Sequence, residues 1–198
     1  MLAKRLVSHL EEIGYRLDYD DSHASRFVKR SWISPVAYLH VVYHPAATPI
    51  VQSVSRRLSF PSEVSAMYES MNGASLFAGA IKIYGCVEEA FPLDRTDPLS
   101  LPPLSIVEMN RMFVPEERSQ QFICIGGYSY DRSLVCIDRE SDEAVCFHGD
   151  TLMQLRKSWR SLENWLAEEI TRLSLLFSPE GRRLVQEKFE LPDSTLHQ

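Results

Sequence analysis

The sequence predicts an α+β fold, in which helices pack on one side of a mixed or mostly antiparallel sheet. Apolar residues recur at helical spacing near the N-terminus and again from residue 152 onward, and β-branched or aromatic runs of strand length lie between them. This order favours separate groups of helices and strands over alternating βαβ units. A chain of 198 residues, with 44% hydrophobic and 24% charged residues, is typical of a protein that buries its own core.

Residues 1–45 predict one helix and two strands. Apolar residues share one helical face from residue 2 to residue 13, and Gly14 follows at the position of a C-cap. Pro35 separates two aromatic and β-branched runs between residues 25 and 43, and each run predicts a strand. Because two strands alone are barely stable in water, we expect this segment to be integrated with the main domain that follows.

The main domain, residues 46–177, is predicted to begin with a pair of helices. Thr48 is expected at the N-cap of the first helix and Pro49 at its first position, where the missing N–H costs nothing. Pro61 opens the second helix in a similar way. Asn72-Gly73 is expected to end it, because these residue types adopt the left-handed conformation that closes helices.

The rest of the chain predicts short strands followed by helices. Residues 91–103 are Pro-rich and predict a long surface loop or a crossing connection, and residues 106–112 predict a short helix over the sheet. From Leu152 the spacing is helical again, until Ser178-Pro179 breaks the helix before a C-terminal helix and tail, residues 178–198. The predicted strands are residues 75–77, 80–84, 122–125, 134–137 and 144–147, and the last three predict an antiparallel meander.

Seven short motifs occur in an order that is known from one protein family. They are Phe60-Pro61-Ser62-Glu63, Met71-Asn72-Gly73, Ile83-Tyr84-Gly85, Ile125-Gly126, Val135-Cys136-Ile137-Asp138, Val145 and Ser161-Leu162-Glu163-Asn164-Trp165-Leu166. In the order and spacing of these motifs, residues 48–170 resemble the SUKH (Smi/Knr-like) superfamily. The chain departs from the family pattern at Phe60, where Leu is usual, and at Tyr130-Asp131, where many members have Gly-Asp. Independently of this resemblance, we expect Trp165 to anchor the core, because it lies on the apolar stripe of its helix.

The resemblance implies a SUKH-like fold and a non-enzymatic, protein-binding function. Many bacterial members of the superfamily look like immunity proteins, which neutralise a toxin by binding to it. The fungal Smi and Knr branch is associated with cell-wall synthesis and signalling, and implies the alternative of a housekeeping adaptor or regulatory scaffold.

The charge of the chain favours a protein partner over a nucleic acid. The net charge is -6 and the isoelectric point is near 5.5, whereas phosphate binding requires clustered Lys and Arg. The alternative is that the chain is acidic only for solubility and binds no basic partner. The short basic clusters, such as Arg56-Arg57, are expected to be salt-bridged on helix surfaces. The N-terminus does not resemble a signal peptide and no run approaches the length of a membrane span, so we expect a cytoplasmic protein without membrane contact.

The candidate partner-binding residues combine acidic side chains with a tyrosine-containing turn. Carboxylates can steer a basic partner, such as a toxin, and exposed aromatic residues are enriched at binding hot spots. The alternative for the tyrosine pair is that one of the two rings packs onto the sheet. The candidates are Glu88, Glu89, Asp94, Asp97, Tyr128, Tyr130 and Asp131.

The sequence predicts no catalytic residue, no cofactor and no metal. Ser129 follows a strand but lacks the second Gly and the following helix of a nucleophile elbow. His40 and His44 are expected on one face of a strand as partly exposed residues, where a metal site would be weak. The alternative from the enzyme class is a hydrolase that uses Ser129 or a metal at these two histidines. The four cysteines are expected to pack in the core, and adjacent carboxylates such as Glu168-Glu169 are expected to be solvated.

Overall fold

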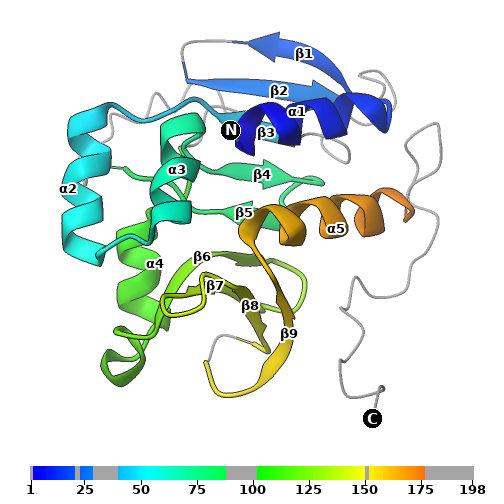
Figure 1. The fold of residues 1–198 in the computed structure, drawn as a ribbon. Helices are drawn as coiled ribbons and strands as arrows, with labels where there is room; N and C mark the ends of the chain where they lie inside the picture. Colours follow the sequence, from blue (N-terminus) through cyan, green and yellow to red (C-terminus); the bar gives the residue numbers. More distant parts are fainter. Residues whose placement is uncertain (1, 21–22, 29–39, 88–101, 150–151, 177–198) are drawn as a thin grey trace.

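One antiparallel sheet organises the fold, with helices on its face (Figure 1). The computed structural model of the chain describes residues 2–20, 23–28, 40–87, 102–149 and 152–176. Within these ranges the sheet has nine strands in sequence order, and each strand is antiparallel to the next. The predicted α+β class is therefore confirmed.

The element bounds are as follows. The helices are α1 (Leu2–Glu12), α2 (Thr48–Leu58), α3 (Ser62–Ser70), α4 (Ile106–Phe113) and α5 (Leu162–Ser174), with a short 3-10 helix η1 (Glu116–Arg118). The strands are β1 (Arg16–Asp20), β2 (Ala24–Val28), β3 (His40–Tyr43), β4 (Ala74–Leu76), β5 (Ile81–Ile83), β6 (Phe122–Tyr128), β7 (Leu134–Asp138), β8 (Ala144–Phe147) and β9 (Leu155–Trp159).

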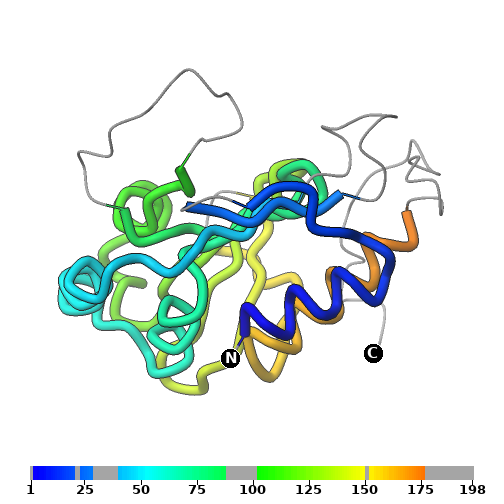
Figure 2. Tube along the Cα trace, turned by 90° about the horizontal axis from the view of Figure 1, so that it is seen from above, coloured from blue at the N-terminus to red at the C-terminus, as the bar shows by residue number. Residues whose placement is uncertain are grey.

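The helices α1, α3 and α5 lie in front of the sheet in Figure 1, and α1 and α5 run side by side in both views (Figure 2). Helix α2 packs on the outer side of α3, and α4 packs beside β6. The core joins all of these layers, and Trp165 on α5 lies fully buried within it, as its place on the apolar stripe predicts.

The N-terminal strands belong to the same sheet as the main domain. Strand β3 pairs with β2 on one side and with β4 on the other, where Val41 is opposite Ser75 and Val42 is opposite Ala74. The outermost strand, β1, was not predicted, because its residues show no buried face: all five positions are exposed. A bulge between Leu17 and Tyr19 interrupts its register with β2, and such bulges discourage an edge strand from pairing with another chain.

The helix boundaries agree with the predictions except in detail. Ala47, not Thr48, is the N-cap of α2, and it provides no side-chain bond, while Pro49 lies in the first turn as predicted. Helix α3 ends at Ser70, and its C-cap Met71 is extended, so Asn72-Gly73 does not cap the helix as predicted but lies beyond it, where Gly73 has a φ of +87°. A Cβ atom at Gly73 would lie 2.5 Å from the carbonyl oxygen of Ile83, so the close approach of β5 also requires glycine there.

The strand β9 is the second element that was not predicted. The helical spacing expected from Leu152 begins only at Leu162, where Ser161 caps α5 by accepting a hydrogen bond from the Asn164 N–H at 3.1 Å. The predicted final helix lies outside the described residues, as do most of the Pro-rich stretch and residues 29–39 around Pro35. Of the two strands expected there, the described parts are β2 and β3.

Two buried asparagines extend the sheet where strand pairing stops. The Asn72 side chain accepts from the Cys86 N–H at 2.7 Å and donates to its carbonyl oxygen at 3.1 Å. Asn110 on α4 does the same for Cys124 on β6, at 2.8 and 2.7 Å. Each side chain therefore replaces a missing neighbouring strand, and satisfies two main-chain groups that water cannot reach.

Candidate binding surfaces

The predicted tyrosine turn lies between β6 and β7, but Tyr128 is not exposed. Only 2% of Tyr128 is accessible, and its hydroxyl accepts a hydrogen bond from Trp165 Nε1 at 2.8 Å. Burial raises the pKa of the Tyr128 phenol. The proposal of Tyr128 as a partner-binding residue is therefore corrected: it is the tyrosine that packs into the core, because the pleat of β6 turns its side chain toward α5.

Tyr130 and Asp131 are held by charged side chains of neighbouring elements. The half-buried Tyr130 ring lies 5.3 Å from the Tyr128 ring, and its hydroxyl accepts from Arg172 Nη2 at 3.3 Å. Asp131 forms an ion pair with Arg156 of β9, and both side chains are nearly buried, with 12% and 7% exposed. The turn is therefore held by contacts to α5, through Arg172, and to β9, through Arg156.

Glu169 lies in the same cluster as Tyr130 and Arg172, and it corrects the expectation that Glu168 and Glu169 are both solvated. It is fully buried, and it accepts three hydrogen bonds from Arg172, of 2.6, 3.1 and 3.2 Å. Glu168 faces the surface, where it accepts from Trp159 Nε1 at 2.9 Å. Adjacent carboxylates on a helix diverge, as expected, but only one of these two is solvated. The remaining predicted candidates, Glu88, Glu89, Asp94 and Asp97, lie outside the described residues.

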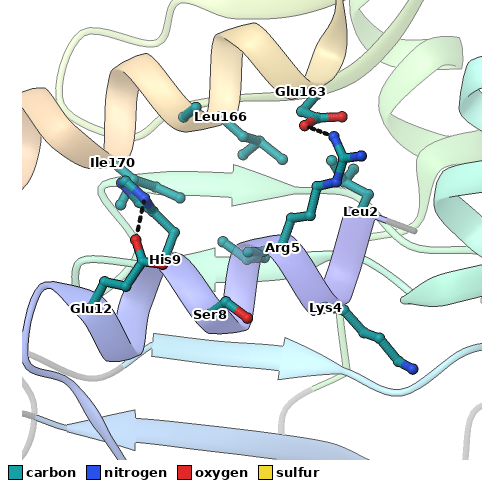
Figure 3. Close-up of a pocket in the computed structure, with 11 residues that line it drawn as sticks. Leu2, Lys4, Arg5, Ser8, His9, Glu12, Glu163, Leu166 and Ile170 are labelled. Atoms are coloured by element: carbon teal, nitrogen blue, oxygen red, sulfur yellow. Dashed lines mark hydrogen bonds and ion pairs between the residues drawn. The ribbon is translucent and has the colours of Figure 1, made fainter.

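A shallow groove runs between α1 and α5 (Figure 3). Its volume is about 360 Å³, and Leu6, Leu166 and Ile170 contribute to its apolar floor. An ion pair between Arg5 and Glu163 spans one end of the groove, and His9 reaches across the other end to Thr171. Contacts between α1 and α5 cross the groove at both ends. We therefore interpret it as the seam where α1 packs on α5.

Helix α2 has one groove along each side. The groove toward α3 has a volume of about 680 Å³ and includes Val51, Arg56 and, on the opposite rim, Glu69. The groove toward α4 has a volume of about 360 Å³ and includes Arg57. Val54 is the one buried residue of α2. We call α2 and these two grooves the α2 surface.

The arginines of the α2 surface correct the expectation that they are salt-bridged. Arg56 and Arg57 are exposed, and neither forms an ion pair with a described carboxylate. The one side-chain bond of Arg56 is to a carbonyl of its own helix, that of Gln52, at 3.4 Å. The sequence contained a signal for this result, because residues 48–58 include no acid that could pair with an arginine one turn away.

One Ser-His-Asp cluster lies at the surface near the start of the sheet. Ser25 Oγ lies 2.6 Å from Asp20 Oδ1 and 2.9 Å from His44 Nε2, and Asp20 Oδ1 lies 3.2 Å from the same His44 nitrogen. In a catalytic triad the carboxylate holds the other ring nitrogen of the histidine. Here the Asp20 carboxylate and the His44 nitrogen lie close to the same hydroxyl of Ser25, so they compete for its proton. The cluster therefore has a structural role, in which it links the end of β1 to the segment after β3.

His40 and His44 do not form the surface pair that the alternation predicted. His40 is fully buried, with its ring centroid 4.1 Å from Tyr15 and 4.5 Å from Phe77. Its Nδ1 accepts from the Phe77 N–H at 3.4 Å. Across the described ranges, no three His, Cys, Asp or Glu side chains are grouped as metal ligands.

The four cysteines are free and buried, as core packing predicts. Burial raises the pKa of Cys86 and of Cys146 to about 12 each, and it also raises the pKa of Cys136. These three thiols therefore stay protonated in the folded protein at neutral pH, which makes them poor nucleophiles.

Comparisons with known proteins add no relative. No protein-family model matches the chain, and no curated protein matches its sequence. The SUKH resemblance therefore depends on the motifs alone. None of the helices in the described ranges combines the length and the apolar character that crossing a membrane requires.

Proposed function

We propose that this protein is a non-enzymatic binding module, which acts by forming a stoichiometric complex with another protein through the α2 surface. The observation that carries the proposal is the pair of exposed arginines, Arg56 and Arg57, each beside its own groove and neither in an ion pair within the part of the chain that the structure describes. Arginine is enriched at protein interfaces, and its planar guanidinium binds carboxylates through two hydrogen bonds.

Charge complementarity identifies the kind of segment that fits. A partner segment with carboxylates over Arg56 and Arg57 would neutralise both cations, and its apolar side chains would enter the larger groove beside Val51. Glu69, on the α3 rim of that groove, fixes the orientation of the segment, because it disfavours a carboxylate on its own side.

The placement of the buried charges also supports binding over catalysis. Asp131 pairs with Arg156 and Glu169 pairs with Arg172, and none of the four lines the three grooves described above. These ion pairs fix the β6–β7 turn in place, which is a structural use of charge.

The partner that we propose is a toxin, which an immunity-type protein would neutralise in the cytoplasm. This part of the proposal rests on the SUKH-like motifs. A single partner can carry both basic and acidic patches. Binding at the α2 surface is therefore compatible with steering of a basic patch by Glu88, Glu89, Asp94 and Asp97.

Affinity capture with matched variants tests the proposal. The tagged wild-type chain, the Arg56→Glu/Arg57→Glu variant and the control Arg160→Glu would each be incubated with lysate of the source organism at moderate salt. Arg160 is exposed but lies outside α2. We expect one stoichiometric protein with the wild type and the control, and at least ten-fold less with the double variant.

The alternatives give different results in the same experiment. Several metabolic or cell-wall proteins in place of one would favour the adaptor. Equal capture by all three chains would exclude the α2 surface as the interface, and no retained protein would contradict the binding function.

A further inference from the structure

Two of the buried cysteines face each other across neighbouring strands. Cys124 on β6 is directly opposite Cys136 on β7, and both residues are fully buried. Cys146 is opposite Val135, the neighbour of Cys136, so its side chain points to the other face of the sheet. Cys86 lies outside the strands. The register therefore brings together one pair of thiols, Cys124 and Cys136.

The hydrogen bonds of Cys124 show which type of cross-strand pair this is. Its N–H donates to Asn110 Oδ1 and its carbonyl oxygen accepts from Asn110 Nδ2, at 2.8 and 2.7 Å. Both main-chain groups of Cys124 are thus directed toward α4 and away from β7. Cys124 and Cys136 therefore form a non-hydrogen-bonded pair, the kind in which the side chains of antiparallel strands are closest.

This geometry matches the requirements of a disulfide. In a non-hydrogen-bonded antiparallel pair the Cα atoms are about 4.5 Å apart. Disulfides span Cα separations of about 4.4–6.8 Å. The bond could therefore form without a change of register.

We propose that Cys124 and Cys136 are a latent dithiol, which a hydroperoxide converts into a cross-strand disulfide. One sulfur, as its thiolate, attacks the peroxide O–O bond, which gives a sulfenic acid and releases an alcohol or water. The second sulfur then attacks the sulfenic sulfur, forms the S–S bond and releases water. In total, two thiols and one hydroperoxide give one disulfide, one alcohol and one water; the thiols lose two electrons and the peroxide gains them.

The burial of the pair makes the reaction conditional. The first step needs access for the peroxide to one of the two sulfurs, and the closed sheet does not provide it, because both residues are fully buried. Oxidation therefore proceeds through local opening of β6 and β7, and its rate reports how often these strands open. The disulfide would then join the two strands that carry the β6–β7 turn.

Thiol counting and peptide mapping test the proposal. The full chain would be treated with hydrogen peroxide, with and without sub-denaturing urea, then unfolded and alkylated at its remaining thiols. We expect two of the four thiols to disappear, a linked peptide containing Cys124 and Cys136, and recovery with dithiothreitol. Sub-denaturing urea should increase the rate at least ten-fold.

Two variants separate this pair from general oxidation. Cys136→Val should abolish the linked peptide while Cys124 remains alkylated or becomes a sulfinic acid, and Cys86→Ala should leave the cross-link unchanged. Cys124→Val provides a second blocked variant if the first does not fold. Survival of all four thiols in the urea sample, or a cross-link that involves Cys86 or Cys146, would overturn the proposal.

Discussion

Replacing Asn110 by alanine should strongly destabilise the protein, because its side chain serves two main-chain groups of β6. Asn110 is 7% exposed and Cys124 is fully buried, so water cannot replace the lost bonds. The Cys124 N–H and carbonyl oxygen would both lose their partner. A buried polar group without a hydrogen bond costs about 1–3 kcal/mol, so two groups cost about 2–6 kcal/mol. Domains of this kind have a free energy of unfolding of about 5–15 kcal/mol in total.

Urea unfolding of Asn110→Ala and of a control on the same helix would measure this cost. Met112 is 66% exposed, so Met112→Ala should change the free energy of unfolding by less than about 0.5 kcal/mol. Asn110→Asp should be as harmful as Asn110→Ala, because a carboxylate keeps the acceptor but places a negative charge against the Cys124 carbonyl oxygen. A loss in Asn110→Ala no greater than in Met112→Ala, at equal m-values, would refute the assignment of Asn110 as a substitute strand.

Three further changes test the buried polar groups. Tyr128→Phe removes the acceptor of Trp165 Nε1 and should cost about 1–3 kcal/mol of unfolding free energy, measured by tryptophan fluorescence in urea; an unchanged midpoint would contradict the bond. Asp131→Ala leaves the buried Arg156 without its carboxylate and should cost about 3–5 kcal/mol in the same assay, whereas a cost below 1 kcal/mol would mean that the pair is solvated. Burial raises the pKa of Glu63 above its ordinary 4.5, so the folded state binds this proton more tightly than the unfolded state does. The free energy of unfolding should therefore fall as the pH rises through and just above 4.5. Glu63→Gln should reduce this pH dependence, and an unchanged slope would exclude Glu63 as its source.

The elements with a strong local pattern could be predicted from the sequence. The helix pair, α4, the three-stranded meander and α5 each combine a hydrophobic period with a cap or turn residue, and all are present in the structure. Strand β1 escaped prediction because an edge strand exposed on both faces leaves no alternation to detect. Strand β9 escaped because its buried residues, Arg156 and Trp159, do not form a regular apolar alternation.

The candidate site was less accessible to sequence analysis, because burial of single polar residues depends on tertiary partners. Tyr128 and His40 belong to types that are often partly exposed, and only the sheet register shows that each points into the core. Glu169 is buried because Arg172 lies on the next turn of α5 and forms a pair with it. By contrast, the lack of acids in residues 48–58 was visible in the sequence, although the expectation of salt-bridged Arg56 and Arg57 did not take it into account.

Hydrogen exchange with and without the captured partner would show whether a protein binds at the α2 surface. Exchange of the wild-type chain would be compared, by mass spectrometry, between the free protein and its complex. Binding at the α2 surface should slow exchange in residues 46–58 and 62–70, which form the larger groove, and change exchange little at the α1–α5 seam. Protection confined to α1 and α5, or to the β6–β7 turn, would exclude the α2 surface and place the interface elsewhere.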